Sequence, residues 1–114
     1  MVASKELTDD VRLAHVMADD ADSISMSRFK AQDLMIKTKP DSTPVTEADT
    51  AVEESIRRTL SRTRPRDAVH GEEMQDTGES NRRWIIDPID GTANYLRGVP
   101  VWATLIALEI DGQI

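Results

Sequence analysis

An α/β fold is predicted by the way helical and strand-like patterns alternate along the sequence. Residues 8–28, and the stretch that starts at Thr46, carry apolar side chains at spacings of three and four, which is typical of amphipathic helices. Short apolar runs of strand length occur at 33–37, 67–70, 84–86 and 101–110. Alternation of this kind, in a chain without internal repeats, favours helices packed on a sheet.

The composition is that of a small acidic protein with room for one domain. The chain has 114 residues, with 14 Lys+Arg against 21 Asp+Glu and a net charge of −7. We expect neither nucleic acid nor an acidic membrane as a partner, because both attract basic patches. The lack of cysteine in this chain excludes disulfides and cysteine-bound zinc. No apolar run has the length of a membrane span or a signal peptide, so the expected location is cytoplasmic.

The first expected helix spans residues 8–28. Thr8 is the candidate cap, and the acids after it suit the positive end of the helix dipole. Its expected apolar face is formed by Val11, Ala14, Ala18 and Ala21. After the expected strand at 33–37, the sequence TKPDSTP (38–44) reads as a turn-rich linker.

The second expected helix opens at Thr46. An acid three residues later, Asp49, completes the pattern of a capping box. Val52, Ile56 and Leu60 then form a stripe at spacing four, and Pro65 ends the region.

The rest of the chain alternates strands and loops. The strand at 67–70 leads into Gly-Glu-Glu at 71–73, and a polar loop at 74–82 follows. Arg82 and Arg83, at the end of this loop, are expected to be solvated. The strand at 84–86 runs into Asp87, and a short helix is expected within 90–97. Residues 101–110 are apolar on both faces, which predicts a strand buried on both sides. Asp111-Gly112 is a hairpin signal with no second strand after it in this sequence.

Acidic residues gather at the ends of these expected elements, and they are the candidate site. The set consists of Asp49, Glu72, Glu73, Asp87 and Asp90. Strand ends are where a sheet presents functional groups, and carboxylate oxygens suit Mg²⁺. Gly91 and Thr92 add backbone amides at a possible helix start, where a phosphate can bind.

Simpler interpretations compete with this one. Taken singly, Glu72 and Glu73 read as solvated acids, and Asp49 as an ordinary first-turn helix acid. Asp87 differs, because an acid directly after a buried apolar strand is costly to bury without a partner. Lys37 and Lys39 could face a phosphate, although solvent is the simpler expectation.

Three motifs in combination are far more specific than their parts. PVTEAD at 44–49, GEE at 71–73 and WIIDPIDGT at 84–92 resemble, in order and spacing, the inositol monophosphatase family. TKPDSTPVTEAD, RPRDAVHGEE and RGVPVWATLIALE are most similar to its histidinol-phosphatase branch. The resemblance implies a layered α/β/α/β/α sandwich, Mg²⁺-dependent hydrolysis of a small phosphate monoester by metal-activated water, and a homodimer when the protein is full length.

The resemblance also implies a role for each candidate. Glu72 and the Ile89 carbonyl would bind a first metal, Asp90 a second, and Asp87 would bridge the two. Glu73 would orient the site partly through water. Asp49 and Thr92 would form the hydrogen-bonded pair that activates the attacking water. The amides of Gly91 and Thr92 would contact the phosphate.

The sequence departs from the family pattern in two respects. Ala93 and Tyr95 stand where Lys or Thr and Phe are usual, which affects the expected pocket wall. The family domain is also more than twice as long, and its second half supplies another metal-binding aspartate and most substrate-selecting groups. We therefore expect residues 1–114 to be the N-terminal part of a single phosphatase domain, and expect that segment alone to be inactive.

Other functions are weighed against this one. A haloacid dehalogenase needs Asp-x-Asp, whereas Asp87 and Asp90 are three apart. An EF-hand needs acids at alternate positions before its glycine, which DPIDGTAN lacks. Hydrolysis of an inositol phosphate or another small monoester, and an inactive metal-binding or interaction fragment, both stay open.

Overall fold

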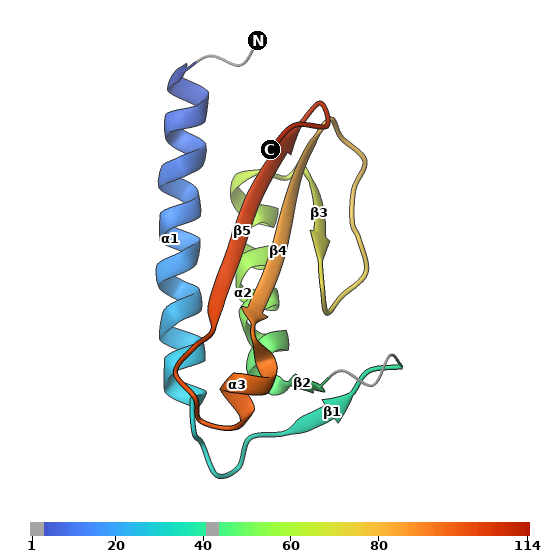
Figure 1. Ribbon diagram of the computed structural model, residues 1–114. Coiled ribbons are helices and arrows are strands. Elements are labelled where there is room, and N and C mark those ends of the chain that lie inside the picture. Colours follow the sequence, from blue (N-terminus) through green and yellow to red (C-terminus); the bar gives the residue numbers. More distant parts are fainter. Residues whose placement is uncertain (1–3, 41–43) are drawn as a thin grey trace.

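The computed structural model describes residues 4–40 and 44–114, and it confirms the α/β class (Figure 1). The elements in chain order are α1 (Ser4–Arg28), β1 (Ile36–Thr38), β2 (Pro44–Thr46), α2 (Glu47–Thr63), β3 (Ala68–Gly71), β4 (Arg82–Asp90), α3 (Thr92–Leu96) and β5 (Ala103–Ile110). None of the helices in the described ranges is both long and apolar enough to cross a membrane.

The centre of the molecule is a three-stranded sheet in the order β3-β4-β5. Strand β4 runs parallel to β3 and antiparallel to β5. Helices α1 and α2 pack against each other and against one face of this sheet, and no described element covers the other face (Figure 1). Strands β1 and β2 form a separate two-stranded ribbon near the carboxyl ends of β3 and β4.

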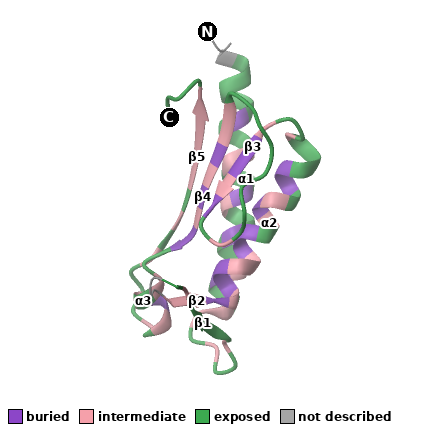
Figure 2. Cartoon of the chain, turned by 90° about the vertical axis from the view of Figure 1, so that its right-hand side faces the viewer, coloured by how far each residue is buried: buried purple, intermediate pink, exposed green. Residues whose placement is uncertain are grey.

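The core lies between the helices and the sheet, where the buried residues of Figure 2 face one another. The stripe of Val52, Ile56 and Leu60 on α2 is buried as predicted. It packs in one cluster with Trp84 and Ile86, the β4 side chains that alternate toward the helices. The Trp84 indole nitrogen donates a hydrogen bond of 2.9 Å to Asp67, so its one polar atom is satisfied.

Helix α1 differs from the prediction in its start and in its buried face. It already includes Ser4, so Thr8 lies inside the helix and the prediction that Thr8 caps it is wrong. Met17 and Ala21 are fully buried, whereas Val11, predicted to be on the apolar face, is 55% exposed. Ala14, also on the predicted face, packs against the core, so the prediction fails only at Val11, whose neighbour Asp10 is turned inward.

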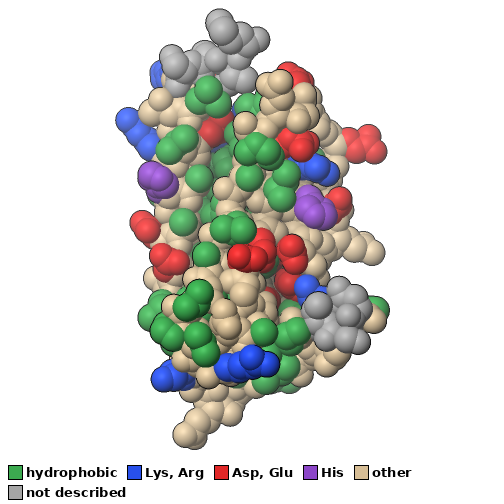
Figure 3. Space-filling view, in the orientation of Figure 1, with side chains coloured by type: hydrophobic (Ala, Val, Ile, Leu, Met, Phe, Trp, Pro, Cys, Tyr) green, Lys and Arg blue, Asp and Glu red, His purple; other side chains and the backbone are tan. Residues whose placement is uncertain are grey.

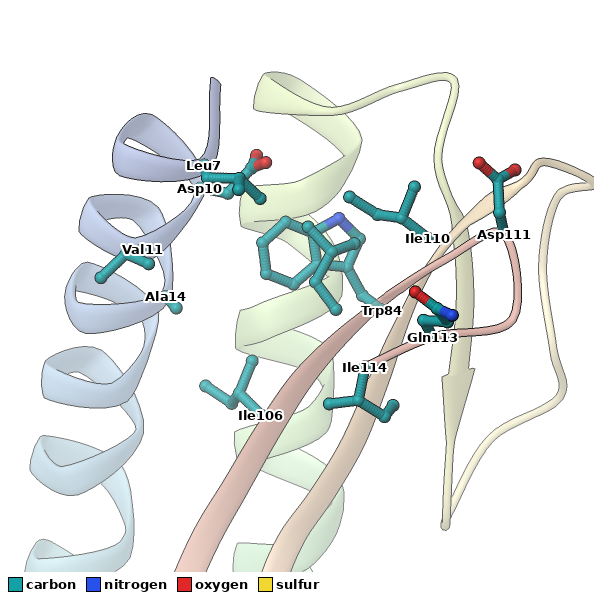
Figure 4. A pocket seen from close by; sticks show the side chains of 11 residues that line it. Leu7, Asp10, Val11, Ala14, Trp84, Ile106, Ile110, Asp111, Gln113 and Ile114 are labelled. Atoms are coloured by element: carbon teal, nitrogen blue, oxygen red, sulfur yellow. The ribbon is translucent and has the colours of Figure 1, made fainter. Parts of the chain in front are cut away.

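A buried ionic network fixes the inward position of Asp10. Its Oδ1 accepts hydrogen bonds from Arg64 at 3.2 Å and from Arg82 at 2.9 Å. Arg82 also bonds Asp67 at 3.1 Å, so the expectation that Arg82 is a solvated loop residue is wrong. Figure 4 shows the open apolar groove beside this network, between α1 and β5.

The strand prediction at 101–110 is right in type and wrong in burial. Strand β5 pairs only with β4 among the described strands, and Leu105 on its outer face is 49% exposed. The turn signal after it is confirmed. Asp111 and Gly112 both have positive φ, and Ile110 and Gln113 exchange two backbone hydrogen bonds across them, as in a two-residue hairpin.

Strands β1 and β2 show where the linker prediction fails. The expected strand 33–37 is shifted to Ile36–Thr38, and part of the expected linker 38–44 pairs back on it as β2. Residues 41–43 of that linker lie outside the described residues. Three-residue strands carry too little sequence pattern for periodicity to find them.

Candidate functional site

Four of the five candidate acids lie at the carboxyl ends of β3 and β4, toward the uncovered face of the sheet, whereas Asp49 is buried on α2. Glu72 and Glu73 directly follow β3, and Asp87 and Asp90 are among the last four residues of β4. Because the two strands are parallel, their ends meet at the same edge. Figure 3 shows acidic side chains gathered in the middle of this face, with a basic side chain beside them.

The end of β4 is shaped by an irregular turn. The register with β5 shifts between Asp87 and Asp90, and the carbonyl of Pro88 accepts a 2.7 Å bond from the Thr104 hydroxyl. Gly91 then adopts φ 89°, where a side chain would be strained and its Cβ would lie 3.1 Å from the Val101 carbonyl. This turn leaves both carboxylates at the same strand end.

A second apolar cluster supports the turn from below. Ile89 and Tyr95 are buried there, and the Tyr95 ring lies edge-on to Trp102 with centroids 5.1 Å apart. The Tyr95 hydroxyl donates a 2.8 Å bond to the Ser25 carbonyl of α1. Burial raises the pKa of this hydroxyl to about 12. Tyr95 therefore anchors α3 to α1, instead of forming part of the pocket wall as the sequence suggested.

Asp87 carries the largest resolved pKa shift among the candidate acids. Burial, the charges of Glu72 and Asp90, and a hydrogen bond to Asp90 raise its pKa to about 7. Crowded carboxylates without a cation favour the protonated form of one of them. The negative charges of Glu72, Asp87 and Asp90 are therefore not balanced at this strand end, and a divalent cation would reduce their repulsion.

Asp49 and Thr92 meet although they are 43 residues apart. The Thr92 hydroxyl lies 3.0 Å from Asp49 Oδ1 and 2.9 Å from the Ile89 carbonyl. The other oxygen of Asp49 accepts bonds from the Thr46 amide at 2.8 Å and the Thr46 hydroxyl at 2.6 Å, which confirms the capping box. Asp49 is only 1% exposed, and among the described residues the hydrogen bond to its Oδ1 comes from Thr92.

Glu73 is set apart from the other acids by Lys39. The ammonium group of Lys39 lies 2.9 Å from Glu73 and 4.0 Å from Glu72. The pKa of Glu73 is raised because burial outweighs the opposing effect of Lys39. The pKa of Lys39 is also raised, because these carboxylates more than offset its own burial. The simpler expectation of a solvated Lys39 is therefore wrong.

The donor atoms fit a hard cation. Glu72, Asp87 and Asp90 offer carboxylate oxygens, and Ile89 adds a carbonyl whose second lone pair remains available beside its bond to Thr92. His70 lines the same pocket as Glu72 and Asp87, but its Nδ1 lies 2.6 Å from Asp76. The four donors are all oxygens, so the set suits Mg²⁺ better than zinc. Within residues 4–40 and 44–114, no three acidic or histidine side chains form a ready-made cation cage.

The predicted phosphate seat lies next to this group. Gly91 is the N-cap of α3 and Thr92 its first residue, so their amides come before any helix carbonyl that could accept from them.

Comparison with known proteins decides the family. The family model described as "Inositol monophosphatase family" matches residues 6–114.

The chain belongs to the inositol monophosphatase family.

Individual members of the family resemble the chain closely. A histidinol-phosphatase of Streptomyces coelicolor is 70% identical over 100 residues, which cover 88% of this chain and 38% of that protein. A histidinol-phosphatase of Mycobacterium tuberculosis is 59% identical over 105 residues, covering 91% and 40%. The crystal structure of the extragenic suppressor protein suhB from Bartonella henselae aligns with a TM-score of 0.86 at 33% identity, covering 91% and 42%. The chain thus spans about two fifths of the length of these family members.

Two residues of the site were missed by sequence reasoning. Lys39 is expected from the sequence to face either a phosphate or, more simply, solvent, and its contact with Glu73 is not foreseen. Glu53 is not a sequence candidate, although its side chain is completely buried and accepts a 2.8 Å bond from the Glu73 amide. One signal could have found Glu53. It is an acid next to the buried stripe of α2, one helical turn after Asp49.

The shifted pKa of Asp87 predicts how stability depends on pH. The folded pKa of about 7 exceeds the ordinary value of 3.8, so the stabilising contribution is complete below about pH 4 and is lost as the pH rises through 7. Asp87→Asn removes this loss. In EDTA, the variant should unfold at the same denaturant concentration as the parent at pH 4 and at a higher one at pH 8. Equal midpoints at pH 8 would contradict the assigned crowding.

The contact between Lys39 and Glu73 predicts an effect on stability. Lys39→Met leaves the Glu73 carboxylate, whose side chain is 6% exposed, without its counter-ion. We expect a loss of about 1–3 kcal/mol in the free energy of unfolding at pH 8. The matched control is Lys37→Met on exposed strand β1, which should change stability by less than about 0.5 kcal/mol. Denaturant titration of both variants tests this, and equal losses would argue against a specific role for Lys39.

Proposed function

We propose that this chain carries the metal-binding part of a Mg²⁺-dependent phosphomonoesterase. The observation that supports this most is the Asp49–Thr92 pair, whose oxygens are 3.0 Å apart. The pair lies beside Asp87, whose pKa is raised by burial and by the negative charges of Glu72 and Asp90. A proton acceptor and a cation-binding group in one place are what hydrolysis of a phosphate ester requires. Membership of the inositol monophosphatase family agrees with this assignment.

Glu72, Asp87, Asp90 and the Ile89 carbonyl are the proposed metal ligands, with Asp87 between the two positions. When bound, Mg²⁺ would lower the pKa of water and neutralise the charge of the phosphate. The protein's own part is to hold these oxygens at one strand end. Lys39 neutralises Glu73, which leaves Glu73 to orient water instead of binding a metal directly.

Asp49 and Thr92 are the proposed route for the proton of the attacking water. Asp49 has almost no contact with solvent, and its Oδ2 is occupied by Thr46. The Thr92 hydroxyl can donate its proton to Asp49 Oδ1 and accept one from water through a lone pair. One proton thus passes from the water to Thr92 and one from Thr92 to Asp49, so the Asp49 carboxylate becomes neutral and the water oxygen attacks as hydroxide.

The phosphate is proposed to bind at the amides of Gly91 and Thr92. These groups are at the N-terminus of α3, next to Asp90 and the Thr92 hydroxyl. These amides would donate hydrogen bonds to the phosphate oxygens.

Histidinol phosphate is the proposed substrate. Support comes from the two curated family members described above, both named histidinol-phosphatase, at 70% and 59% identity. An inositol phosphate is the second candidate, because the family model carries that name. Since this chain spans about two fifths of its relatives, substrate-selecting groups are expected mainly in the remaining part.

The wider organisation stays a prediction. We propose that residues 1–114 form the N-terminal part of one phosphatase domain, that this segment alone is inactive, and that the whole protein is a cytoplasmic homodimer. Exposed apolar residues on and before β5, such as Leu105 and Val101, are the surface that requires cover.

The test is a chimera in which this chain replaces the matching 100-residue segment of the Streptomyces coelicolor histidinol-phosphatase. Phosphate release is measured from histidinol phosphate and from inositol monophosphate, with Mg²⁺ and with EDTA. We expect Mg²⁺-dependent release, faster from histidinol phosphate. Release that persists in EDTA, or none with any phosphate ester from a folded chimera, would contradict the proposed function.

A further inference from the structure

We propose that Glu53 is a positioning residue that holds the Gly71-Glu72-Glu73 turn in place for cation binding. The inference rests on the proposed function, because it concerns the same metal site. Glu53 lies on α2, and its carboxylate is hydrogen-bonded to the Glu73 amide and to Arg57.

The contacts of Glu53 hold its carboxylate in a fixed position. Its side chain is completely buried, and each of its oxygens has a partner. Oε1 accepts a 2.8 Å hydrogen bond from the amide of Glu73, and Oε2 accepts a 3.0 Å bond from the Arg57 guanidinium. The bond to the Glu73 amide joins α2 directly to the backbone that carries the carboxylates of Glu72 and Glu73.

The Glu53 carboxylate also packs closely against Gly71. A Cβ built on Gly71 would lie 2.4 Å from both the Cδ and the Oε1 atom of Glu53, closer than real Cβ atoms approach. Gly71 is absent from the glycines with positive φ in the described ranges, so its backbone does not itself require glycine. The glycine is needed because the Glu53 carboxylate occupies the space beneath it.

The spacing on α2 gives Glu53 a counterpart. Asp49 and Glu53 are four residues apart and lie on the same buried face of the helix. Asp49 contacts Thr92 after β4, and Glu53 contacts Glu73 after β3. One helix therefore fixes the segments that follow two neighbouring strands, which sets the distance between the two halves of the site.

An ordinary helix ion pair does not account for these facts. Glu53 and Arg57 have the four-residue spacing of such a pair, but pairs of this kind are usually solvated. Here the Glu53 carboxylate is inaccessible to solvent, and one of its two oxygens accepts a hydrogen bond from the Glu73 amide. Arg57 extends to the same loop, with bonds of 3.3 Å to Thr77 and 3.4 Å to the Met74 carbonyl.

The experiment compares Glu53→Gln with Glu53→Met in the chimera defined above, which contains the full 114-residue chain. Both variants remove the charge, and both leave Arg57 without its carboxylate. Only glutamine keeps an acceptor oxygen for the Glu73 amide. Mg²⁺ affinity is measured by isothermal titration calorimetry. We expect Glu53→Met to weaken binding about 10–100-fold, the usual effect of removing a group that orients a ligand, and Glu53→Gln to recover most of it.

Two further variants keep the result interpretable. Arg57→Met removes the other partner of Glu53 and should lower stability while leaving Mg²⁺ affinity close to that of the parent. Gly71→Ala keeps Glu53 and displaces the turn, so it should weaken Mg²⁺ binding in a chimera whose core is unchanged. It should do so much less when Glu53→Ala has removed the carboxylate beneath it.

The outcomes separate the inference from the function on which it rests. Asp87→Asn is titrated in parallel as a change to a proposed ligand. If Asp87→Asn abolishes Mg²⁺ binding while Glu53→Met and Gly71→Ala leave it unchanged, the positioning role is wrong and the metal site stands. If Asp87→Asn itself leaves binding unchanged, the proposed metal site is wrong.

Discussion

Replacing Asp87 by asparagine in the chimera is expected to reduce phosphate release at least about 10³-fold. The loss is this large because bound cations supply several kcal/mol of charge stabilisation, and each 1.4 kcal/mol corresponds to a factor of ten in rate. Asparagine has nearly the same shape and removes the charge that the neighbouring acids already oppose. The fold should therefore be retained. The measurement is kcat/KM with saturating Mg²⁺, together with the circular dichroism spectrum.

Asp76→Asn is the matched control for Asp87→Asn. Asp76 is an exposed acid that pairs with His70 at 2.6 Å and takes no part in the proposed ligand set. Its replacement should leave turnover nearly unchanged. A folded Asp87→Asn chimera with turnover similar to that of Asp76→Asn would show that the ligand set is wrong.

Thr92→Val is expected to lower kcat by about 10²–10⁴-fold, the usual contribution of general-base catalysis. Valine keeps the shape of threonine but removes the hydroxyl that bonds Asp49 Oδ1. Thr92→Ser keeps that hydroxyl and should retain most of the activity. Steady-state kinetics on the three chimeras, with Mg²⁺ affinity measured in parallel, test this.

Metal affinity separates two explanations of such a result. Thr92 also bonds the Ile89 carbonyl, so its loss could act through the metal instead of through the proton. The proton route predicts a large fall in kcat with little change in Mg²⁺ affinity. Equal activity of Thr92→Val and Thr92→Ser would rule the route out.

The second helix was predictable because its signals are local. The Thr46–Asp49 capping box and the stripe of Val52, Ile56 and Leu60 lie within one short segment. The predicted face of the first helix holds at Ala21 and fails at Val11, because Asp10 is held inward by Arg64 and Arg82, which are 54 and 72 residues away. A polar residue drawn into the core by distant partners leaves no mark in hydrophobic periodicity.

Strand β5 was predicted correctly as a strand, but its burial on both faces was predicted wrongly. Apolar residues on both faces of 101–110 indicate a strand with two covered faces, but the described chain covers only one, and Leu105 is exposed on the other. Periodicity reports which side chains favour burial, whereas the covering element has to come from elsewhere in the fold.

The candidate site was predictable where one motif carries several groups. Asp87, Asp90 and Thr92 lie within six residues of sequence, and the parallel pairing of β3 and β4 adds Glu72 and Glu73 at the same edge. The contacts of Lys39 and Glu53 could not be predicted in this way. They join segments 34 and 20 residues apart, and only the packing of α2 and of the segment after β1 places them beneath the acids.

The central claim is that the carboxyl ends of β3 and β4 hold the catalytic cations, and a crystal of the chimera grown with Mn²⁺ in place of Mg²⁺ tests it most directly. The anomalous difference map locates the metal without reference to activity. We predict two peaks. One should lie within bonding distance of Glu72, Asp87 and the Ile89 carbonyl, and the other within bonding distance of Asp87 and Asp90. A fully occupied metal elsewhere, with these carboxylates unligated, would contradict the account.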